Sequence, residues 1–426
     1  MLKAILHHSP VPVKLLYTLH SGTFATAEEG KTPSVEQREL LDRAKEHIIT
    51  AVAVPDCATE LAAINLSYGL AKIHHVQETL GYPADALFVA SPDMTTPRGL
   101  TKWRWGLGAG GMLSWGDGSR PLAFLDLQIS ASTALVGGLS REPDLELTTT
   151  QIHRLRQSPP VVMGLEVGWG FGSGNHFINA YRVRPIVDDP LPPYVFVLHS
   201  GNGDVRRPSV LGIGLNYEKS KPLQELMKTI DTPLGPTRVL TGQAARDYYA
   251  MYLHYEEFVR EKHLILGAEI FGEFTPISNE THHGLADANS ALLGCCRFSA
   301  DQRTIFPVTL RSDLPGYLVR GQPNIDSELL PCNHLPATIR RRVHTANILP
   351  HGGGFTYPRV RTVTDVLLLG QQRYYVLDSV GGGKRVVESL STLMYTHRGF
   401  EVMDRLREWR LADIIAELQL LFSVTT

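Results

Sequence analysis

Seventeen histidines are distributed over the chain, and five of them stand beside glycines or at the end of an apolar run: His176, His199, His282, His283 and His351. Imidazole is the most common protein ligand for mid-sized divalent metals, and it becomes a competent nucleophile when a phosphate charge is neutralised. Three histidines and one carboxylate would be enough to hold such a metal. For each histidine alone a packed or surface role is the simpler interpretation, so the metal hypothesis depends on their convergence.

Two of these histidines adjoin glycine-rich segments. His176 follows the glycine-rich residues 170–175, and His351 is followed by three consecutive glycines, residues 352–354. Because glycine has no side chain, the backbone amides of such a segment can contact an anion closely. A flexible turn without a ligand is the alternative interpretation of the triple glycine.

The segments that must position these residues have the patterns of mixed α and β structure. Apolar residues at helical spacing predict helices over residues 36–54, 59–80, 244–267 and 399–422. Apolar runs predict strands over residues 86–90, 122–130, 161–167, 194–198, 360–369 and 374–378, the last leading to a hairpin turn at residues 381–383. Residues 103–118, rich in Gly and Trp, are expected to form a loop, and residues 295–320 strands and turns. No internal repeat or low-complexity linker divides the chain, which favours a single domain.

The composition is that of a globular protein with no overall attraction for nucleic acid. Hydrophobic residues make up 43% and charged residues 20% of the 426 positions, and 41 basic against 43 acidic residues give a net charge of −2. Any phosphate-binding surface must therefore be local. The four cysteines are too few for a disulfide framework, which favours a reducing compartment, and no apolar run is long enough to cross a membrane.

The N-terminal segment is free of acidic residues, since the first one is Glu28. This pattern is typical of an organellar presequence, although such segments are usually rich in arginine and this one has none. We expect residues 1–27 to be either a targeting segment or an extended N-terminus, and residues 28–426 to form the globular domain. The expected compartment is cytoplasmic or mitochondrial.

Several short motifs, taken in order, resemble those of the RtcB family of GTP-dependent RNA ligases. Residues 170–178 (GFGSGNHFI) resemble its GNHF motif, residues 198–201 (LHSG) its second histidine motif, and residues 351–354 (HGGG) its HGAGR loop. Weaker matches are residues 91–93 (SPD), 125–126 (LD) and 314–316 (LPG). The resemblance covers most of the chain from Ala86 onward. It implies one large RtcB-like domain of the α/β (α+β) class, with mixed sheets around a histidine-rich cleft and long helices packed outside.

The resemblance also implies roles for individual residues. The family's Mn²⁺ ligands fall on Asp126, His176, His199 and His283, with His282 as the alternative to His283. The histidine that attacks GTP falls on His351, and the nucleotide-binding positions fall on Asn175, Ser200, Gly352, Gly353 and Gly354. The family reaction opens an RNA 2′,3′-cyclic phosphate to a 3′-phosphate, activates it with GMP, and joins it to a 5′-hydroxyl.

Several positions depart from the family pattern. The metal-bridging cysteine aligns with Ile129, and the hydroxyl of the neighbouring Ser130 is neutral where a thiolate would carry charge. Thr95, Phe298 and Phe355 stand in place of a histidine, a lysine and an arginine. Losing one charged contact to a transferring phosphoryl group typically costs about 2.7–4 kcal/mol. Several losses together would slow the reaction by many powers of ten.

Two functions from different classes follow from these observations. The first is a degenerate ligase, an RtcB-like protein of RNA processing that binds RNA or docks with protein partners in a ribonucleoprotein complex. The alternative is an active Mn²⁺- and GTP-dependent RNA ligase, and a metallohydrolase using the histidines and Asp126 alone is a variant of it. Nearby Arg206, Arg207 and Arg359 could supply replacement charge for the lost cations.

Two further groups of residues have both a structural and an RNA-binding interpretation. Trp103, Trp105 and Trp115 could stack on bases, but tryptophans in such a stretch more often pack a long loop. The arginine triplet at residues 340–342 could contact phosphates, but a short basic triplet is usually a solvated turn.

Overall fold

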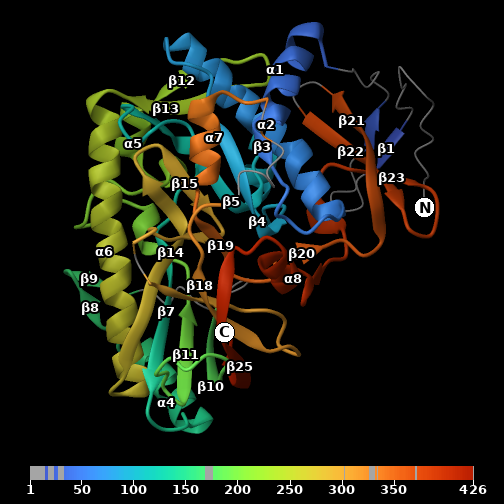
Figure 1. Ribbon diagram of the computed structural model, residues 1–426. Coiled ribbons are helices and arrows are strands. Elements are labelled where there is room, and N and C mark those ends of the chain that lie inside the picture. Colours follow the sequence, from blue (N-terminus) through green and yellow to red (C-terminus); the bar gives the residue numbers. More distant parts are fainter. Residues whose placement is uncertain are drawn as a thin grey trace.

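The computed structural model describes residues 33–167, 176–301, 303–325, 332, 334–369 and 372–425, and two short strands ahead of them, β1 (Leu15–Tyr17) and β2 (Phe24–Thr26). Apart from these two strands, the expected N-terminal segment lies outside the described residues. The structure is of mixed α and β type (Figure 1). None of the helices formed by the described residues combines the length and the hydropathy that crossing a bilayer requires.

The central element is a sheet of eleven strands in the order β17–β18–β25–β10–β11–β7–β14–β15–β5–β4–β3. Neighbouring strands are antiparallel except β3 and β4, which are parallel. Its strands are β3 (Ile48–Ile49), β4 (Leu87–Thr95), β5 (Ala109–Ser114), β7 (Ser132–Leu139), β10 (Phe177–Pro185), β11 (Tyr194–His199), β14 (Thr275–Asp287), β15 (Ser290–Leu293), β17 (Ile305–Val308), β18 (Gly316–Gly321) and β25 (Ala412–Val424).

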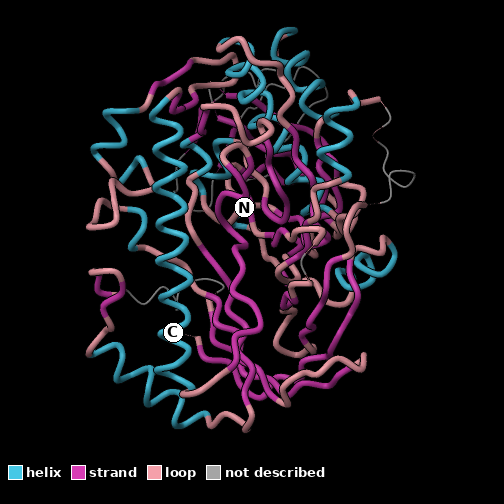
Figure 2. Tube along the Cα trace, turned by 60° about the vertical axis from the view of Figure 1, so that its left-hand side comes forward, coloured by secondary structure: helices cyan, strands magenta, loops and turns pink. Residues whose placement is uncertain are grey.

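Long helices cover the outside of this sheet. Helix α6 extends along one side, where it packs on β7 and β14, while α1 and α2 lie across the upper part (Figure 1). The view turned by 60° shows the same arrangement, with helices outside and strands through the middle (Figure 2). The helices are α1 (Val35–Glu46), α2 (Cys57–Thr79), α3 (Leu100–Trp105), α4 (Leu145–Gln157), α5 (Lys221–Leu226), α6 (Gln243–Phe271), α7 (Ala337–His344) and α8 (Glu401–Glu408).

Smaller sheets connect distant segments. Strand β6 (Leu122–Phe124) pairs with β13 (Thr237–Thr241), which also pairs with β12 (Lys228–Ile230). Strands β21 (Val360–Leu369), β22 (Gln372–Ser379) and β23 (Lys384–Val387) form a separate antiparallel sheet. The remaining pairs are β8 (Val161–Val162) with β9 (Leu165–Glu166), β16 (Cys295–Arg297) with β19 (Ile348–Pro350), and β20 (Phe355–Thr356) with β24 (Thr396–His397).

Several predicted elements are confirmed. The helices predicted over residues 59–80 and 244–267 correspond to α2 and α6. The strands predicted over residues 86–90, 194–198, 360–369 and 374–378 lie in β4, β11, β21 and β22, and the predicted turn at residues 381–383 joins β22 to β23.

The prediction of a C-terminal helix over residues 399–422 was wrong. Helix α8 ends at Glu408, Arg410 adopts a left-handed backbone conformation (φ 49°), and β25 begins at Ala412. The apolar spacing suited a helix, but β25 lies between β10 and β18, so its backbone groups bond to two strands. Tertiary pairing therefore overrides the local periodicity.

Other boundaries were also wrong. The helix predicted over residues 36–54 ends at Glu46, because residues 48 and 49 join the sheet as β3. The strand predicted over residues 122–130 is limited to β6, and residues 125–127 form a 3₁₀ turn. Residues 161–167 contain two short paired strands, and the expected loop at residues 103–118 contains the end of α3 and all of β5.

The tryptophans are interior residues, whereas the arginine triplet lies on a helix with two of its three side chains exposed. Trp103, Trp105 and Trp115 are buried, and the Trp115 indole N–H donates to the Leu122 carbonyl at 2.8 Å. The triplet lies in helix α7, where Arg342 donates to the Asp85 and Ser114 carbonyls at 3.0 and 2.9 Å. Burial of the tryptophans supports their packing interpretation. The triplet is helical where a turn was expected, but Arg340 and Arg341 are exposed as expected and only Arg342 is partly buried.

Two buried histidines, His47 and His74, join α1 and α2 to the sheet. Their rings meet edge to face, and His47 Nδ1 and His74 Nε2 lie 2.9 and 2.8 Å from the Ala86 carbonyl oxygen. Burial lowers the pKa of both groups, to about 3 for His74. In the unfolded chain a histidine has a pKa near 6.5. As the pH falls, these two histidines are therefore protonated in the unfolded chain before they are protonated in the folded one.

We expect the free energy of unfolding to be highest above pH 6.5 and to decrease as the pH falls from 6.5 toward 3. The His74→Gln variant should weaken this pH dependence by up to about 1.4 kcal/mol per pH unit, because one fewer buried group must be charged. Urea unfolding at several pH values measures the slope. His254→Gln, at an exposed histidine of α6, is the control and should retain the wild-type slope. An unchanged slope in His74→Gln would contradict the prediction.

Candidate functional site

A pocket of about 750 Å³ lies where the end of β11 and an inner part of β14 meet the loop that follows β19. Its lining includes all five histidines selected from the sequence, together with the three consecutive glycines: His176, His199, His282, His283, His351, Gly352, Gly353 and Gly354. The predicted nucleotide-binding residue Asn175 lies outside the described residues. Of the predicted site residues that the structure describes, Asp126 and Ser200 do not line the pocket.

The strand register explains why these histidines meet. Strand β7 lies between β11 and β14, with Ala134 opposite His199 and Ser132 opposite His283. The two histidines therefore come from strands that flank the same short segment of β7. His176 immediately precedes β10 and packs over Gly201, where an added Cβ would lie 2.5 Å from the His176 ring.

The imidazole rings form a compact group. The His282 ring centre lies 4.4 Å from that of His199 and 5.1 Å from that of His351, with nearly parallel planes. The His176 and His199 centres are 5.7 Å apart. Burial, and then the neighbouring His199 and His351, holds the pKa of His282 well below its ordinary value. Its ring is therefore neutral at pH 7.

His351 lies against a buried carboxylate. Its Nδ1 is 3.2 Å from Asp93 Oδ2, and the Asp93 side chain is only 1% exposed. The Ser91 hydroxyl donates to the other carboxylate oxygen. A carboxylate beside Nδ1 favours the proton on that nitrogen, which leaves a lone pair on Nε2. Asp93 lies in a sequence motif, but nothing in the sequence placed it beside His351.

Four cationic side chains also line the pocket: Arg98, Lys102, Arg206 and Arg311. Lys102 Nζ lies 2.6 Å from His283 Nε2, and Arg98 stacks over the Tyr395 ring at 4.8 Å. Arg311 is paired with Asp313 at 3.0 Å. No aspartate or glutamate is among the described residues of the lining, so most of this positive charge lacks a carboxylate partner there.

Burial and neighbouring positive charges lower the pKa values of Lys102 and His283. Burial and then the Arg206 charge lower the pKa of Lys102 to about 7. Burial, followed by Lys102 and Arg206, holds the pKa of His283 well below its usual value. An anion in the pocket would reverse the repulsive contribution to both shifts. Sequence reasoning missed Lys102, because a single lysine just before the tryptophan-rich segment carries no motif.

The loop after His199 is anchored by buried polar contacts. The Ser200 hydroxyl, expected near a nucleotide, instead lies 2.7 Å from His263 Nε2. The fully buried Lys262 donates to Asn202 at 2.7 Å and lies 3.5 Å from Asp204, two residues before Arg206. These contacts fix the short helical turn Asp204–Arg206, from which Arg206 contributes to the pocket.

Asp126, the predicted carboxylate ligand, lies outside the lining that the five histidines share. Its carboxylate is buried and accepts hydrogen bonds from the Arg238 backbone N–H at 2.6 Å and from Arg238 Nη1 at 2.8 Å. The cause is the 3₁₀ turn that contains it, which ends at Gln128 in a left-handed conformation (φ 47°). Gln128, Ser130 and Ser132 line the pocket, whereas Asp126 pairs with Arg238 of β13.

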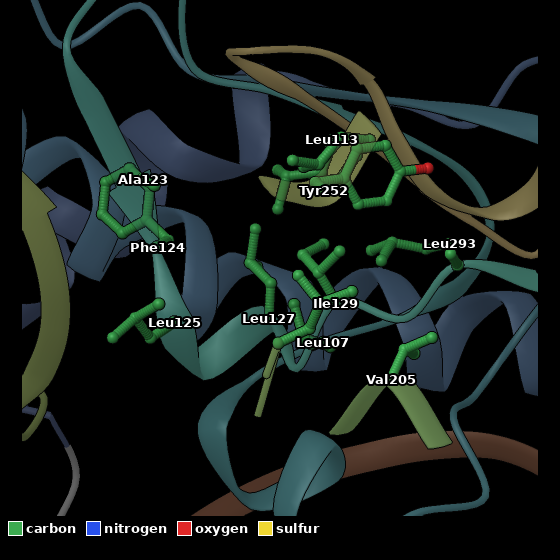
Figure 3. Close-up of a cluster of buried hydrophobic side chains, with 14 of the residues drawn as sticks. Leu107, Leu113, Ala123, Phe124, Leu125, Leu127, Ile129, Val205, Tyr252 and Leu293 are labelled. Carbon is green, nitrogen blue, oxygen red and sulfur yellow. The ribbon is translucent and has the colours of Figure 1, made fainter. Parts of the chain in front are cut away.

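The donor set does not fit the two-metal centre that the resemblance implies. Ile129, in the place of the bridging cysteine, belongs to the apolar cluster shown in Figure 3 and is 2% exposed. All four cysteines are buried, and none of them lines the pocket. The Nε2 atom of His283 contacts Lys102. Among the described residues, no group of three or more His, Cys, Asp or Glu side chains is arranged to hold a metal.

The arrangement is suited to binding an anion. Neutral imidazoles, cationic side chains and a glycine loop can all supply hydrogen-bond donors to phosphate oxygens. His351 lines the same pocket, and an imidazole with a free ring nitrogen can act there as a nucleophile or proton acceptor.

The glycine loop depends on close backbone packing at Gly354. This residue has φ +59°, and an added Cβ would lie 2.3 Å from the Asp93 carbonyl oxygen. We expect Gly354→Ala to lower the free energy of unfolding by roughly 1–3 kcal/mol and to displace the loop after His351. Chemical unfolding measures this change. Gly381→Ala, where no atom lies within 4 Å of the added Cβ, is the control and should behave as wild type. Equal stability of the two variants would refute the expectation.

The comparisons with known proteins leave the family open. No protein-family model matches the chain, and no curated protein matches it. The motif resemblance therefore remains a prediction, and the site is interpreted from its own chemistry.

Proposed function

We propose that this chain is a divergent RtcB-like protein of RNA processing whose pocket binds a phosphorylated RNA end. The observation that carries the proposal is the composition of the pocket. Its described lining holds four cationic residues, six histidines and three consecutive glycines, and no carboxylate. In a protein of net charge −2, this is a local concentration of positive charge.

The chemistry of a terminal phosphate matches this lining. A phosphate monoester is a compact dianion, and charged donors bind it more strongly than neutral ones do. The pocket volume lies within the range of about 300–1,000 Å³ that is usual for small-ligand sites. Phe177 and Phe355 add aromatic surface to the lining, on which a base could stack.

The same geometry favours binding over guanylylation. The Asp126 carboxylate is engaged by Arg238, and Ile129 offers no thiolate. We therefore propose RNA as the partner, with further proteins of a ribonucleoprotein complex as candidates, and no requirement for Mn²⁺ or GTP. In this proposal the protein is a degenerate member of the ligase family.

Binding to RNA ends tests this proposal. A short fluorescent RNA with a 3′-phosphate should bind at least about tenfold more tightly than the same RNA with a 3′-hydroxyl, measured by fluorescence anisotropy. Arg206→Gln should reduce this preference severalfold. Arg207→Gln is the matched control, because Arg207 is the exposed neighbour that does not line the pocket. Equal affinities for the two RNAs would overturn the proposal.

The alternative of an active ligase is favoured by one observation, the contact of His351 with the buried Asp93. With Mn²⁺ and radiolabelled GTP, the degenerate protein should acquire no covalent label. A label lost in His351→Gln and kept in His397→Gln would instead establish the alternative, because both histidines line the pocket and only His351 contacts Asp93.

A further inference from the structure

Lys102 enters the pocket on an anchored segment. It is the third residue of α3 and directly precedes Trp103. Both Trp103 and Trp105 are buried. Asn65 of α2 donates to the Trp103 carbonyl at 2.9 Å, and Lys72 of α2 donates to the Trp105 carbonyl at 3.2 Å. The backbone around Lys102 is therefore held against α2.

The contact of Lys102 with His283 occupies the Nε2 atom of the imidazole ring. When the Lys102 side chain is charged it has only donors, and at 2.6 Å it then donates to a lone pair on His283 Nε2. The imidazole proton then lies on Nδ1, which is 3.1 Å from the Ser130 hydroxyl. The lone pair with which His283 would bind a metal is therefore used by an ammonium group.

The remaining donors of Lys102 face a pocket without acidic groups. Of the cations in the described lining, Arg311 has a carboxylate partner, whereas neither Lys102 nor Arg206 pairs with one among the described residues. Lys102 and Arg206 line the same cavity as the glycines after His351. An oxygen-rich anion is the ligand class that would satisfy these donors together.

We propose that the Lys102 ammonium takes the place of a metal ion and binds the phosphoryl group of the RNA end directly. This inference rests on the proposed function and extends it, because it names the cation that binds the phosphoryl group in place of a metal. Lys102 and Arg206 together supply positive charge to the phosphate, and His283 and Ser130 hold Lys102 in position.

The experiment uses the full chain and the fluorescent 3′-phosphorylated RNA, titrated once in EDTA and once in Mn²⁺. Wild-type affinity should agree within about twofold between the two buffers. Lys102→Met should bind this RNA about tenfold to a hundredfold more weakly, and its preference for the 3′-phosphate over the 3′-hydroxyl RNA should be largely lost. Lys102→Arg should restore most of the preference. Lys219→Met, at an exposed lysine outside the pocket, should match the wild type.

The possible results separate the two proposals. A phosphate preference that survives in a folded Lys102→Met variant would overturn the role of Lys102 and leave the proposed function intact. A preference that requires Mn²⁺ would overturn the role of Lys102 and the metal independence of the site, and would leave only the binding of a phosphorylated RNA end. Equal binding of the two RNAs in both buffers would remove the proposed function, and this inference with it. Circular dichroism establishes that the variants are folded, and the comparison of EDTA with Mn²⁺ in the wild type needs no variant.

Discussion

The site depends on the pairing of β7 with β11 and β14. This register sets Ala134 opposite His199 and Ser132 opposite His283, so that two histidines about 80 residues apart in sequence come to one region of the sheet. Side chains normally alternate between the two faces of a strand, but the β7–β14 register shifts between Thr281 and His283, where the adjacent His282 and His283 both line the pocket. The pocket is therefore a consequence of strand register, and it requires the long-range pairing of the complete sheet.

A second constraint holds the glycine loop in place. The Arg398 guanidinium donates to Asp56 at 2.7 and 2.8 Å, and the Asp56 carboxylate also accepts the Ala58 and Thr59 amides as the N-cap of α2. The Arg398 backbone N–H donates to the Gly354 carbonyl at 3.3 Å. Because the Arg398 side chain is 2% exposed, this ion pair is shielded from solvent, and breaking such a pair is costly. The loop after His351 is thus connected to the beginning of a long helix.

The electrostatic character of the pocket results from where the carboxylates lie. Asp126 pairs with Arg238, Asp204 lies beside Lys262, and Asp313 pairs with Arg311. Asp93 is buried next to His351 and is absent from the lining. Asp126 and Asp204 are therefore engaged outside the lining, and Asp313 compensates Arg311 alone, so that no carboxylate of the described lining faces Lys102 or Arg206. A cavity of this kind attracts anions even though the whole chain is nearly neutral.

The sequence alone determined the elements whose patterns are long and unambiguous, such as α2, α6 and β21, and it singled out the five histidines and the glycines after His351. It could not determine the secondary structure of residues 412–424, because their apolar spacing suits a helix. They form a strand because the backbone groups of two neighbouring strands hydrogen-bond to them. Nor could the sequence show that Lys102 lines the pocket and that Asp126 does not. A local turn directs the carboxylate to Arg238, and tertiary packing of α3 brings the ammonium to His283. Side-chain type and periodicity are local properties, whereas the partner of a charge is decided only when distant segments fold together.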